Sequence, residues 1–345
     1  CYTIEIEEND GFKEDLNFAK KVSKTLNVKL DVIKVTPADM IENLQNMVFD
    51  LDEPLGDPAP LNVYFISKLA RKNGHKVLLS GTGGDDIFSG YRRHLSTNII
   101  RYTRHIPSFF FNFPNFIFSN LNKNSNIIRR INKLFSILSN NKEEQLFNFY
   151  KWADDDLLKK ILNKDYHYSI KNTQDEFTNF FNQFKIYKNY DMLDEMLLLD
   201  QRFFLTDHNL CYTDKMSMKT GVEVRVPFLD KELVEFASTI ENRCKQSFFQ
   251  SKNILKITME KFFSKDIIYR PKTGFGLPIR SWIKNDLYEY VNEILSKKNI
   301  DKYGIFNFSN VRLLIENNKK GTIDASYTIF SLMCIQMWLD KFYTK

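Results

Sequence analysis

Apolar and polar positions follow regular periods along the start of the chain. Residues 2–7 alternate as a strand does, residues 29–35 are typical of a second strand, and residues 12–26 between them have helical spacing. Thr36-Pro37 is a helix start signal, with threonine as N-cap and proline in the first turn, and a further helix is predicted over residues 61–72. This order predicts a parallel sheet with right-handed crossovers, and ligands in such sheets bind beyond the carboxyl ends of the strands.

A glycine-rich segment follows the next strand. The apolar run Val77 to Leu79 predicts a short strand buried on both faces, and Gly81, Gly83 and Gly84 let the backbone turn and approach a ligand, with free amides as an anion site. Asp85 then stands where a helix begins, where it either stabilises that helix or binds Mg²⁺ beside a phosphate. A turn that only joins strand to helix is equally consistent, and neither a Walker A loop nor a dinucleotide fingerprint is present.

The rest of the chain is predicted to be largely helical, with a few polar stretches. Residues 52–60 hold three prolines and form either a solvated turn or a loop shaping a pocket. The basic residues of 122–133 are interpreted as a solvated helix face. Asp207 and His208 form a candidate acid/base or metal pair, although a surface role is commoner, and Glu223 and Arg225 are predicted to form an ion pair.

A loop over residues 269–282 presents cationic groups. It contains Arg270 and Lys272 beside two glycines and two prolines, and such cations can neutralise phosphate charge in a transition state. A solvent-exposed loop without a catalytic role is the alternative. A final amphipathic helix is predicted over residues 326–343.

Composition restricts the class of protein. The 345 residues carry a net charge of +6, which is modest and gives no reason to expect nucleic-acid binding, and no segment is long and apolar enough to predict a membrane span. Four cysteines lie far apart without a Cys-x-x-Cys pair, which favours a reduced, cytoplasmic protein. The chain opens with Cys1 directly into a strand, so we expect it to be a fragment of a longer protein.

Four stretches together resemble the synthetase domain of the glutamine-hydrolysing asparagine synthetase family. The family's Ser-Gly-x-Gly-x-Asp-Glu and Phe-x-Gly-Tyr pattern resembles Ser80 to Tyr91. Its Asp-Glu-Pro loop resembles Asp52 to Pro58, its Glu-x-Arg-Val-Pro-Phe-Leu-Asp element resembles Glu223 to Asp230, and its Lys-x-Gly-Phe loop resembles Lys272 to Phe275. The resemblance covers nearly the whole chain.

The resemblance implies a fold and an architecture. The fold class is α/β, with a parallel sheet of the adenine-nucleotide α-hydrolase (ATP pyrophosphatase, Rossmann-like) type followed by a largely helical part. Residues 1–345 would form one asparagine-synthetase-like domain, with residues 1–93 as the nucleotide-binding core, truncated at its start, and residues 94–345 completing the active site.

The resemblance also implies a reaction, in which a carboxylate attacks ATP to give an acyl-adenylate that ammonia converts to an amide. ATP and Mg²⁺ would be the cofactors, aspartate or an analogue the acid, and a glutaminase domain missing here the source of ammonia; a homodimer is one assembly it allows. Phosphate and adenylate binding is implied for Ser80, Gly81, Gly83 and Gly84, metal binding for Asp85, and catalytic roles for Lys272, Thr82 and Asp207.

Departures from the family leave alternatives open. The pyrophosphate-binding Ser-Gly-Gly-x-Asp-Ser loop is absent from the chain, which is therefore expected to be inactive alone and to bind ATP weakly. Thr82 stands where the family has an acidic residue, and threonine cannot act as a base at neutral pH. The alternatives are a related amidotransferase acting on a sugar acid or a secondary-metabolite precursor, and a non-catalytic nucleotide-binding module.

Overall fold

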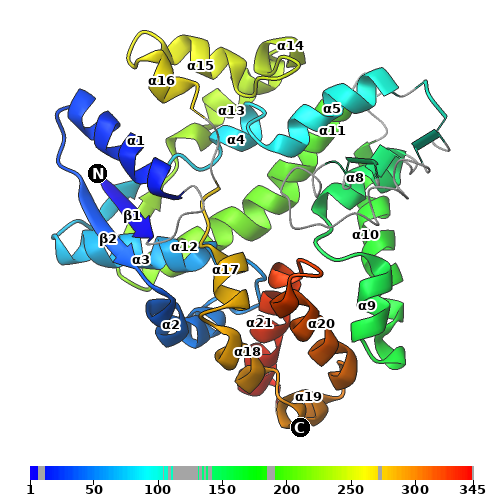
Figure 1. The fold of residues 1–345 in the computed structure, drawn as a ribbon. Coiled ribbons are helices and arrows are strands. Elements are labelled where there is room, and N and C mark those ends of the chain that lie inside the picture. The colour runs from blue at the N-terminus through cyan, green and yellow to red at the C-terminus, as the bar shows by residue number, and fades with distance from the viewer. Residues whose placement is uncertain are drawn as a thin grey trace. The chain divides into compact units, whose positions relative to one another are not determined.

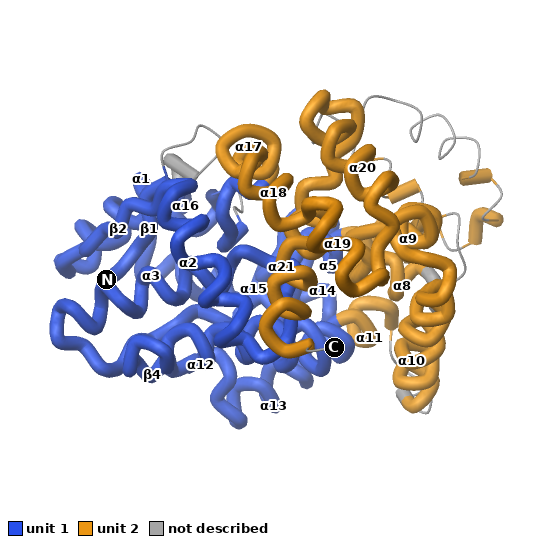
Figure 2. The backbone as a smooth tube through the Cα atoms, turned by 90° about the horizontal axis from the view of Figure 1, so that it is seen from below, with its two compact units in different colours: residues 1–95, 197–279 blue, residues 96–196, 280–345 orange. Residues whose placement is uncertain are grey.

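The computed structural model describes residues 1–6, 12–103, 105–107, 110–111, 131, 134–135, 137–138, 142–184, 191–270 and 274–343. They form two compact units, drawn in blue and orange in Figure 2. The first unit contains residues 1–95 and 197–279, and the second contains residues 96–196 and 280–345. This grouping differs from the boundary at residue 93 that we expected, because residues 197–279 return to the first unit.

The first unit begins with the predicted strand–helix–strand order. Strand β1 (Tyr2–Ile6) pairs in parallel with β2 (Asp31–Val35), from Tyr2 opposite Asp31 to Ile6 opposite Val35 (Figure 1). Helix α1 (Phe12–Thr25) connects the two strands, which confirms the helix predicted over residues 12–26. Two adjacent parallel strands need a crossover connection, which is usually a helix. Helix α1 is that crossover, and its apolar spacing predicted it.

Helix α2 (Pro37–Asp50) begins where its start signal predicted. Thr36 accepts a hydrogen bond from the Asp39 amide, and the Asp39 side chain accepts one from the Thr36 amide at 2.9 Å, which forms a complete capping box. Met40, Leu44 and Val48 lie on one face and are buried. Helix α3 (Ala59–Lys72) follows the proline-rich loop, so the predicted helix over residues 61–72 is confirmed.

The strand before the glycine-rich segment is more exposed than predicted. Strand β3 (Val77–Leu79) pairs in parallel with β4 (Glu223–Arg225), and β1 pairs only with β2, so the described strands form two separate two-stranded sheets. Val77 is 40% and Leu79 74% exposed, which makes the prediction of burial on both faces wrong. Alternate side chains of a strand share a face, and the face that carries these two residues is left open.

The remaining elements of the first unit are helical. Helix α4 (Gly84–Ile87) follows the glycine-rich turn, and the π-helix η2 (Asp200–Leu210) runs into α12 (Cys211–Met218). After β4 come the short helices η3 (Pro227–Leu229), α13 (Lys231–Thr239), α14 (Asn242–Lys245), α15 (Asn253–Met259) and α16 (Lys265–Ile268).

The regular elements among the described residues of the second unit are helices, as predicted for residues 94–192, with one isolated antiparallel bridge between Leu162 and Phe306. Three of the described helices run from one unit into the other, α5 (Arg92–Thr103), α11 (Met192–Leu199) and α17 (Ile279–Lys284). The others are α8 (Lys142–Tyr150), α9 (Asp155–Ile161), η1 (Lys164–Tyr166), α10 (Tyr168–Phe184), α18 (Tyr288–Ile294), α19 (Lys297–Tyr303), α20 (Phe308–Lys320) and α21 (Ser326–Phe342). The basic stretch 122–133 lies outside the described residues except for residue 131. Among the helices described, none is long and apolar enough to cross a bilayer.

Candidate active site

The glycine-rich segment leaves β3 through a turn that two hydroxyl groups stabilise. The Ser80 amide donates to the carbonyl of Arg225 at 2.8 Å, which extends the β3–β4 pairing by one bond. The Ser80 and Thr82 hydroxyl oxygens lie 2.8 Å apart, and the Thr82 amide donates to Ser80 Oγ at 3.2 Å. The Thr82 hydroxyl therefore contacts Ser80, and among the residues that the structure describes no side chain caps α4.

The three glycines of this turn differ in whether backbone conformation or packing requires a glycine. Gly83 has φ of 93°, and a Cβ there would lie 2.4 Å from Leu229 Cδ2, so both its conformation and its packing exclude a side chain. A Cβ at Gly84 would lie 3.4 Å from the Phe228 ring. Among the described residues a Cβ at Gly81 would meet nothing within 4 Å, so their packing does not require glycine there. An open backbone at Gly81 is what close approach of a ligand needs.

Asp85 is the first carboxylate after the turn and is paired with a lysine. Lys252 Nζ lies 3.0 Å from Asp85 Oδ1, and both side chains are about three-quarters buried. Lys252 has φ of 52°, a strained conformation for a non-glycine residue, immediately before α15. A Cβ at Gly90 would lie 1.7 Å from Asp85 Oδ1, so the glycine of the Phe-x-Gly-Tyr motif leaves room for this carboxylate.

A second lysine lies near the same carboxylate. Burial lowers the pKa of Lys256, the charge of Lys252 lowers it further, and the charge of Asp85 raises it. No sequence motif that we recognised contains Lys252 or Lys256, so neither was predicted as a site residue. Two cations beside one carboxylate give the end of the glycine-rich segment a positive environment.

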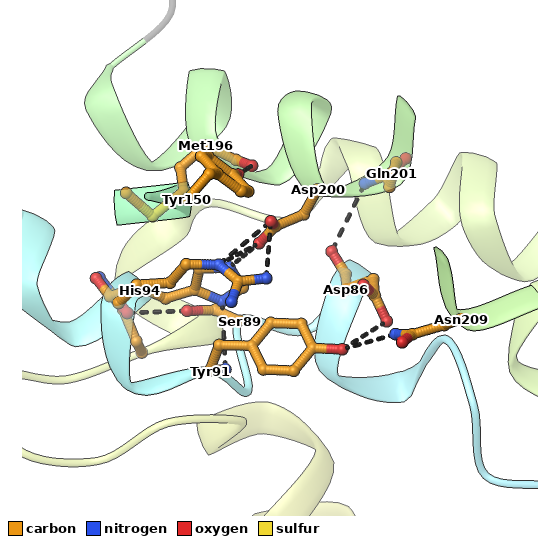
Figure 3. Close-up of polar contacts among 11 residues, drawn as sticks. Asp86, Ser89, Tyr91, His94, Tyr150, Met196, Asp200, Gln201 and Asn209 are labelled. Atoms are coloured by element: carbon orange, nitrogen blue, oxygen red, sulfur yellow. Dashed lines mark hydrogen bonds and ion pairs between the residues drawn. The ribbon is translucent and has the colours of Figure 1, made fainter. Parts of the chain in front are cut away.

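Asp86, on α4, is buried and lies close to Tyr91 and Asn209 (Figure 3). Burial, followed by the Asp200 and Asp85 carboxylates, raises the pKa of Asp86 to about 7. The Tyr91 hydroxyl donates to Asp86 Oδ2 at 3.4 Å and accepts from Asn209 Nδ2 at 3.2 Å. Among the described residues no group hydrogen-bonds Asp86 Oδ1.

A buried ion cluster fixes the start of α5 to the start of η2. Arg93 donates from Nη2 and Nε to the Asp200 carboxylate at 2.7–3.1 Å, and His94 Nε2 lies 2.5 Å from Asp200 Oδ2. The Arg93 guanidinium also lies over the rings of Tyr91 and Phe204, 4.1 and 4.5 Å from their centroids. Burial alone raises the pKa of Asp200, but the His94 hydrogen bond and the Arg93 charge outweigh it, so that pKa is lowered.

The candidate pair Asp207–His208 does not form. Asp207 is exposed and pairs with Arg202 at 3.2 Å, whereas His208 turns to Asp57 of the proline-rich loop, with Nε2 3.3 Å from Oδ2. The predicted ion pair between Glu223 and Arg225 is confirmed at 2.8 Å. Lys272 lies outside the described residues, and in the part of the chain that is described no three metal-ligating side chains gather at one point.

One protein-family model matches nearly the whole chain. The model of the family described as asparagine synthase matches residues 1–340. The chain belongs to the asparagine synthase family. Its described residues are consistent with the nucleotide α-hydrolase type of fold, as a mostly helical α/β protein with small parallel sheets.

Several curated relatives carry the same family name. The chain is 26% identical to "Asparagine synthetase [glutamine-hydrolyzing] 1" of Bacillus subtilis, over 96% of this chain and 50% of that protein. It is 25% identical to "Putative asparagine synthetase [glutamine-hydrolyzing]" of Mycobacterium tuberculosis H37Rv, over 96% and 49%. A more distant relative is "Amidase chyE" of Penicillium rubens, 19% identical over 92% and 49%. The chain spans about half the length of these relatives.

Proposed function

We propose that this chain is the synthetase part of an ATP-dependent, amide-forming ligase that uses ammonia released from glutamine. The observation that carries the proposal is the family match over residues 1–340, together with a glycine-rich turn that is open at Gly81 and ends at Asp85. The substrate carboxylate would attack the α-phosphorus of ATP, with pyrophosphate leaving, and ammonia would then displace AMP from the acyl-adenylate.

Each residue of the turn has a proposed part in that reaction. The Ser80 hydroxyl and the backbone amides at Gly81, Gly83 and Gly84 are expected to bind phosphate and the acyl-adenylate, because backbone amides at such a turn attract anions. In this structure the Gly84 amide donates to the Gly81 carbonyl at 3.4 Å. Lys272 is expected to stabilise charge that develops on the α-phosphate, where a fixed cation contributes most. Lys252 joins this group in our proposal, since its ammonium already lies 3.0 Å from Asp85.

The residues present fit a Mg²⁺ ion that arrives with its nucleotide. Mg²⁺ in nucleotide sites is usually held by one or two carboxylates, with phosphate and water as the other ligands. Asp85 would supply one such carboxylate, which in this structure contacts Lys252. The chemistry that Mg²⁺ would supply is neutralisation of part of the phosphate charge, and Lys252 adds a positive charge beside the same carboxylate.

The acceptor acid is proposed to be aspartate or a larger acid. Thr82 carries no base, and its hydroxyl is bonded to Ser80, so deprotonation of the attacking amine falls to another group. Asp207 remains the sequence-derived candidate, although it is exposed and paired with Arg202. A sugar acid or a secondary-metabolite precursor is the second candidate, because Thr82 occupies less space than a glutamate. Cytoplasmic location and homodimer formation stay predictions.

The test is an assay of the full-length gene product with ATP, Mg²⁺, ammonia and a panel of acids that includes aspartate. Formation of AMP and pyrophosphate in step with one amide product supports the proposal. A non-catalytic nucleotide-binding module would bind ATP and release neither product with any acid.

A further inference from the structure

Two non-glycine residues near the glycine-rich turn have a positive φ, and each contacts the segment that contains the other. Ser89 lies two residues after α4 with a φ of 61°, and Lys252 directly precedes α15 with a φ of 52°. This conformation is costly for a residue with a side chain and persists where the surroundings enforce it, often at ligand sites. Strain on both sides of one pair of contacts indicates that the fold keeps these contacts at a cost.

The Ser89 side chain is buried and bonds a glutamine from a distant part of the sequence. Ser89 Oγ donates to Gln246 Oε1 at 2.7 Å, and Gln246 Nε2 donates to the His94 carbonyl at 3.2 Å. Ser89 is 0% and Gln246 5% exposed. Removing one partner of a buried hydrogen bond leaves the other to bear the cost of its desolvation, so such a bond holds its two segments together. Gln246 is thereby attached to the segment that runs from α4 into α5.

Lys252 is the second point at which the same two segments meet. Residues 246–252 join α14 to α15 (Figure 1), and Lys252 Nζ lies 3.0 Å from Asp85 Oδ1. The joining segment is therefore attached to residues 85–94 at its first residue and at its last.

Apolar packing contributes little to the placement of this joining segment. Its two phenylalanines are exposed, Phe248 by 44% and Phe249 by 86%. Apolar packing resumes in α15, where Ile254 and Leu255 contact the buried cluster that contains Ile87. Lys252 precedes these contacts, so we attribute the position of its ammonium to the polar contacts at the two ends of the segment.

We propose that Ser89 is a positioning residue, which acts through Gln246 to keep the Lys252 ammonium at the Asp85 carboxylate. The proposal rests on the function proposed above, in which Lys252 contributes to binding of the nucleotide phosphates. With the Ser89 hydroxyl in place, the cation is in position before the nucleotide arrives. Without this hydroxyl, nucleotide binding has to order residues 246–252, and the entropy lost in that ordering lowers the affinity.

Titration calorimetry of the full-length protein with ATP and Mg²⁺ tests the positioning role. Ser89→Ala should weaken binding about two- to tenfold, the range expected for loss of one hydrogen bond, with little change in kcat. In a Lys252→Ala background the same substitution should change the affinity by less than about twofold, because the group that Ser89 positions is gone. Ser67→Ala is the matched control, since Ser67 is similarly buried and its hydroxyl has no hydrogen-bond partner among the described residues.

Hydrogen–deuterium exchange of the full-length protein without nucleotide separates the positioning role from the proposed function. Exchange in peptides covering residues 246–256 should become about two- to tenfold faster in Ser89→Ala and stay at the wild-type rate in Ser67→Ala. If the wild type does not bind ATP, the proposed function fails and the exchange rates alone decide whether Ser89 holds the segment. Ser89→Gly removes the same hydroxyl without backbone strain and replaces Ser89→Ala if that variant does not fold.

Two results would overturn the proposal. Equal losses of ATP affinity on substitution of Ser89 in the wild-type and Lys252→Ala backgrounds would show that Ser89 acts independently of Lys252. Wild-type exchange rates over residues 246–256 in Ser89→Ala would show that its hydroxyl does not hold the segment.

Discussion

The ammonium of Lys252 lies 3.0 Å from the carboxylate of Asp85, although the two residues belong to sequence segments that share no motif. The contact holds the first carboxylate that follows the glycine-rich turn, near the proposed phosphate site. It also places a cation there before any nucleotide binds. The first two predictions follow from this pair.

Asp85→Asn should abolish Mg²⁺-dependent pyrophosphate exchange in the full-length protein, because a neutral amide is a poor ligand for a hard cation. Asp266→Asn is the matched control, since Asp266 forms an exposed pair with Lys21 in the same unit. Exchange in Asp85→Asn at the rate of the control would remove Asp85 from the metal site.

Lys272→Ala and Lys252→Ala should affect different kinetic quantities, the first kcat and the second ATP affinity. Lys272→Ala should lower kcat by at least about a hundredfold with little change in ATP affinity, because its contact is proposed to form mainly in the transition state. Lys252→Ala should weaken ATP binding more than it lowers kcat, since its cation is in place beforehand. Titration calorimetry and steady-state kinetics measure the two effects. Equal losses of affinity and turnover in Lys272→Ala would assign that lysine to ground-state binding.

Asp200→Asn should be the most destabilising of these substitutions. It leaves Arg93 without its carboxylate in a buried site, and breaking one side of a buried pair costs about 3–5 kcal/mol in the free energy of unfolding. Glu223→Gln breaks a pair whose members are more than half exposed, so it should lower the free energy of unfolding far less than Asp200→Asn does. Urea denaturation of both variants gives the comparison, and similar values for the two would contradict a buried cluster.

The same aspartate makes stability depend on pH in a stated direction. The pKa of Asp200 is lower in the folded protein than its ordinary value of 3.8, so its contribution is present above that value and is lost as the pH falls through the folded pKa. The difference in unfolding free energy between the wild type and Asp200→Asn should therefore shrink as the pH is lowered from 6 to 3. A constant difference would mean that the carboxylate is not held ionised.

Local signals in the sequence were sufficient to predict many of the helices and strands of the first unit. The capping box at Thr36 and Asp39 and the helical spacing after residue 12 involve residues a few positions apart, so the pattern contains the interaction. The β3–β4 pair joins segments far apart in the chain, and the exposure of Leu79 depends on what covers that sheet. Neither the pairing partner of β3 nor the exposure of Leu79 can be predicted from the apolar run Val77 to Leu79 alone.

The contacts around the site were harder to predict for the same reason. Arg93 and Asp200 are 107 positions apart, and no sequence motif that we recognised connects them. Asp207 and His208 lie in η2, which is a π-helix. Its hydrogen bonds join residues five apart, so its side chains do not lie on the faces that an α-helical period predicts. Asp57 became the partner of His208 as a result.

Thr82→Glu tests the identity of the acceptor. If a larger acid fills the space beside Thr82, the wild type should form asparagine slowly, and Thr82→Glu should form it faster by restoring an acid near the amine. Thr82→Ser keeps the hydroxyl that bonds Ser80 and serves as the control. Rapid asparagine formation by the wild type, with no gain in Thr82→Glu, would show that the acceptor is aspartate itself.

The central claim is that a carboxylate is activated by direct attack on the α-phosphorus of ATP. The measurement is the fate of ¹⁸O in the carboxylate of whichever acid supports turnover by the full-length protein, with the nucleotide products analysed by mass spectrometry. We predict that one ¹⁸O atom per turnover appears in AMP and none in pyrophosphate. Formation of ADP with ¹⁸O in inorganic phosphate would show attack on the γ-phosphorus and would contradict the account.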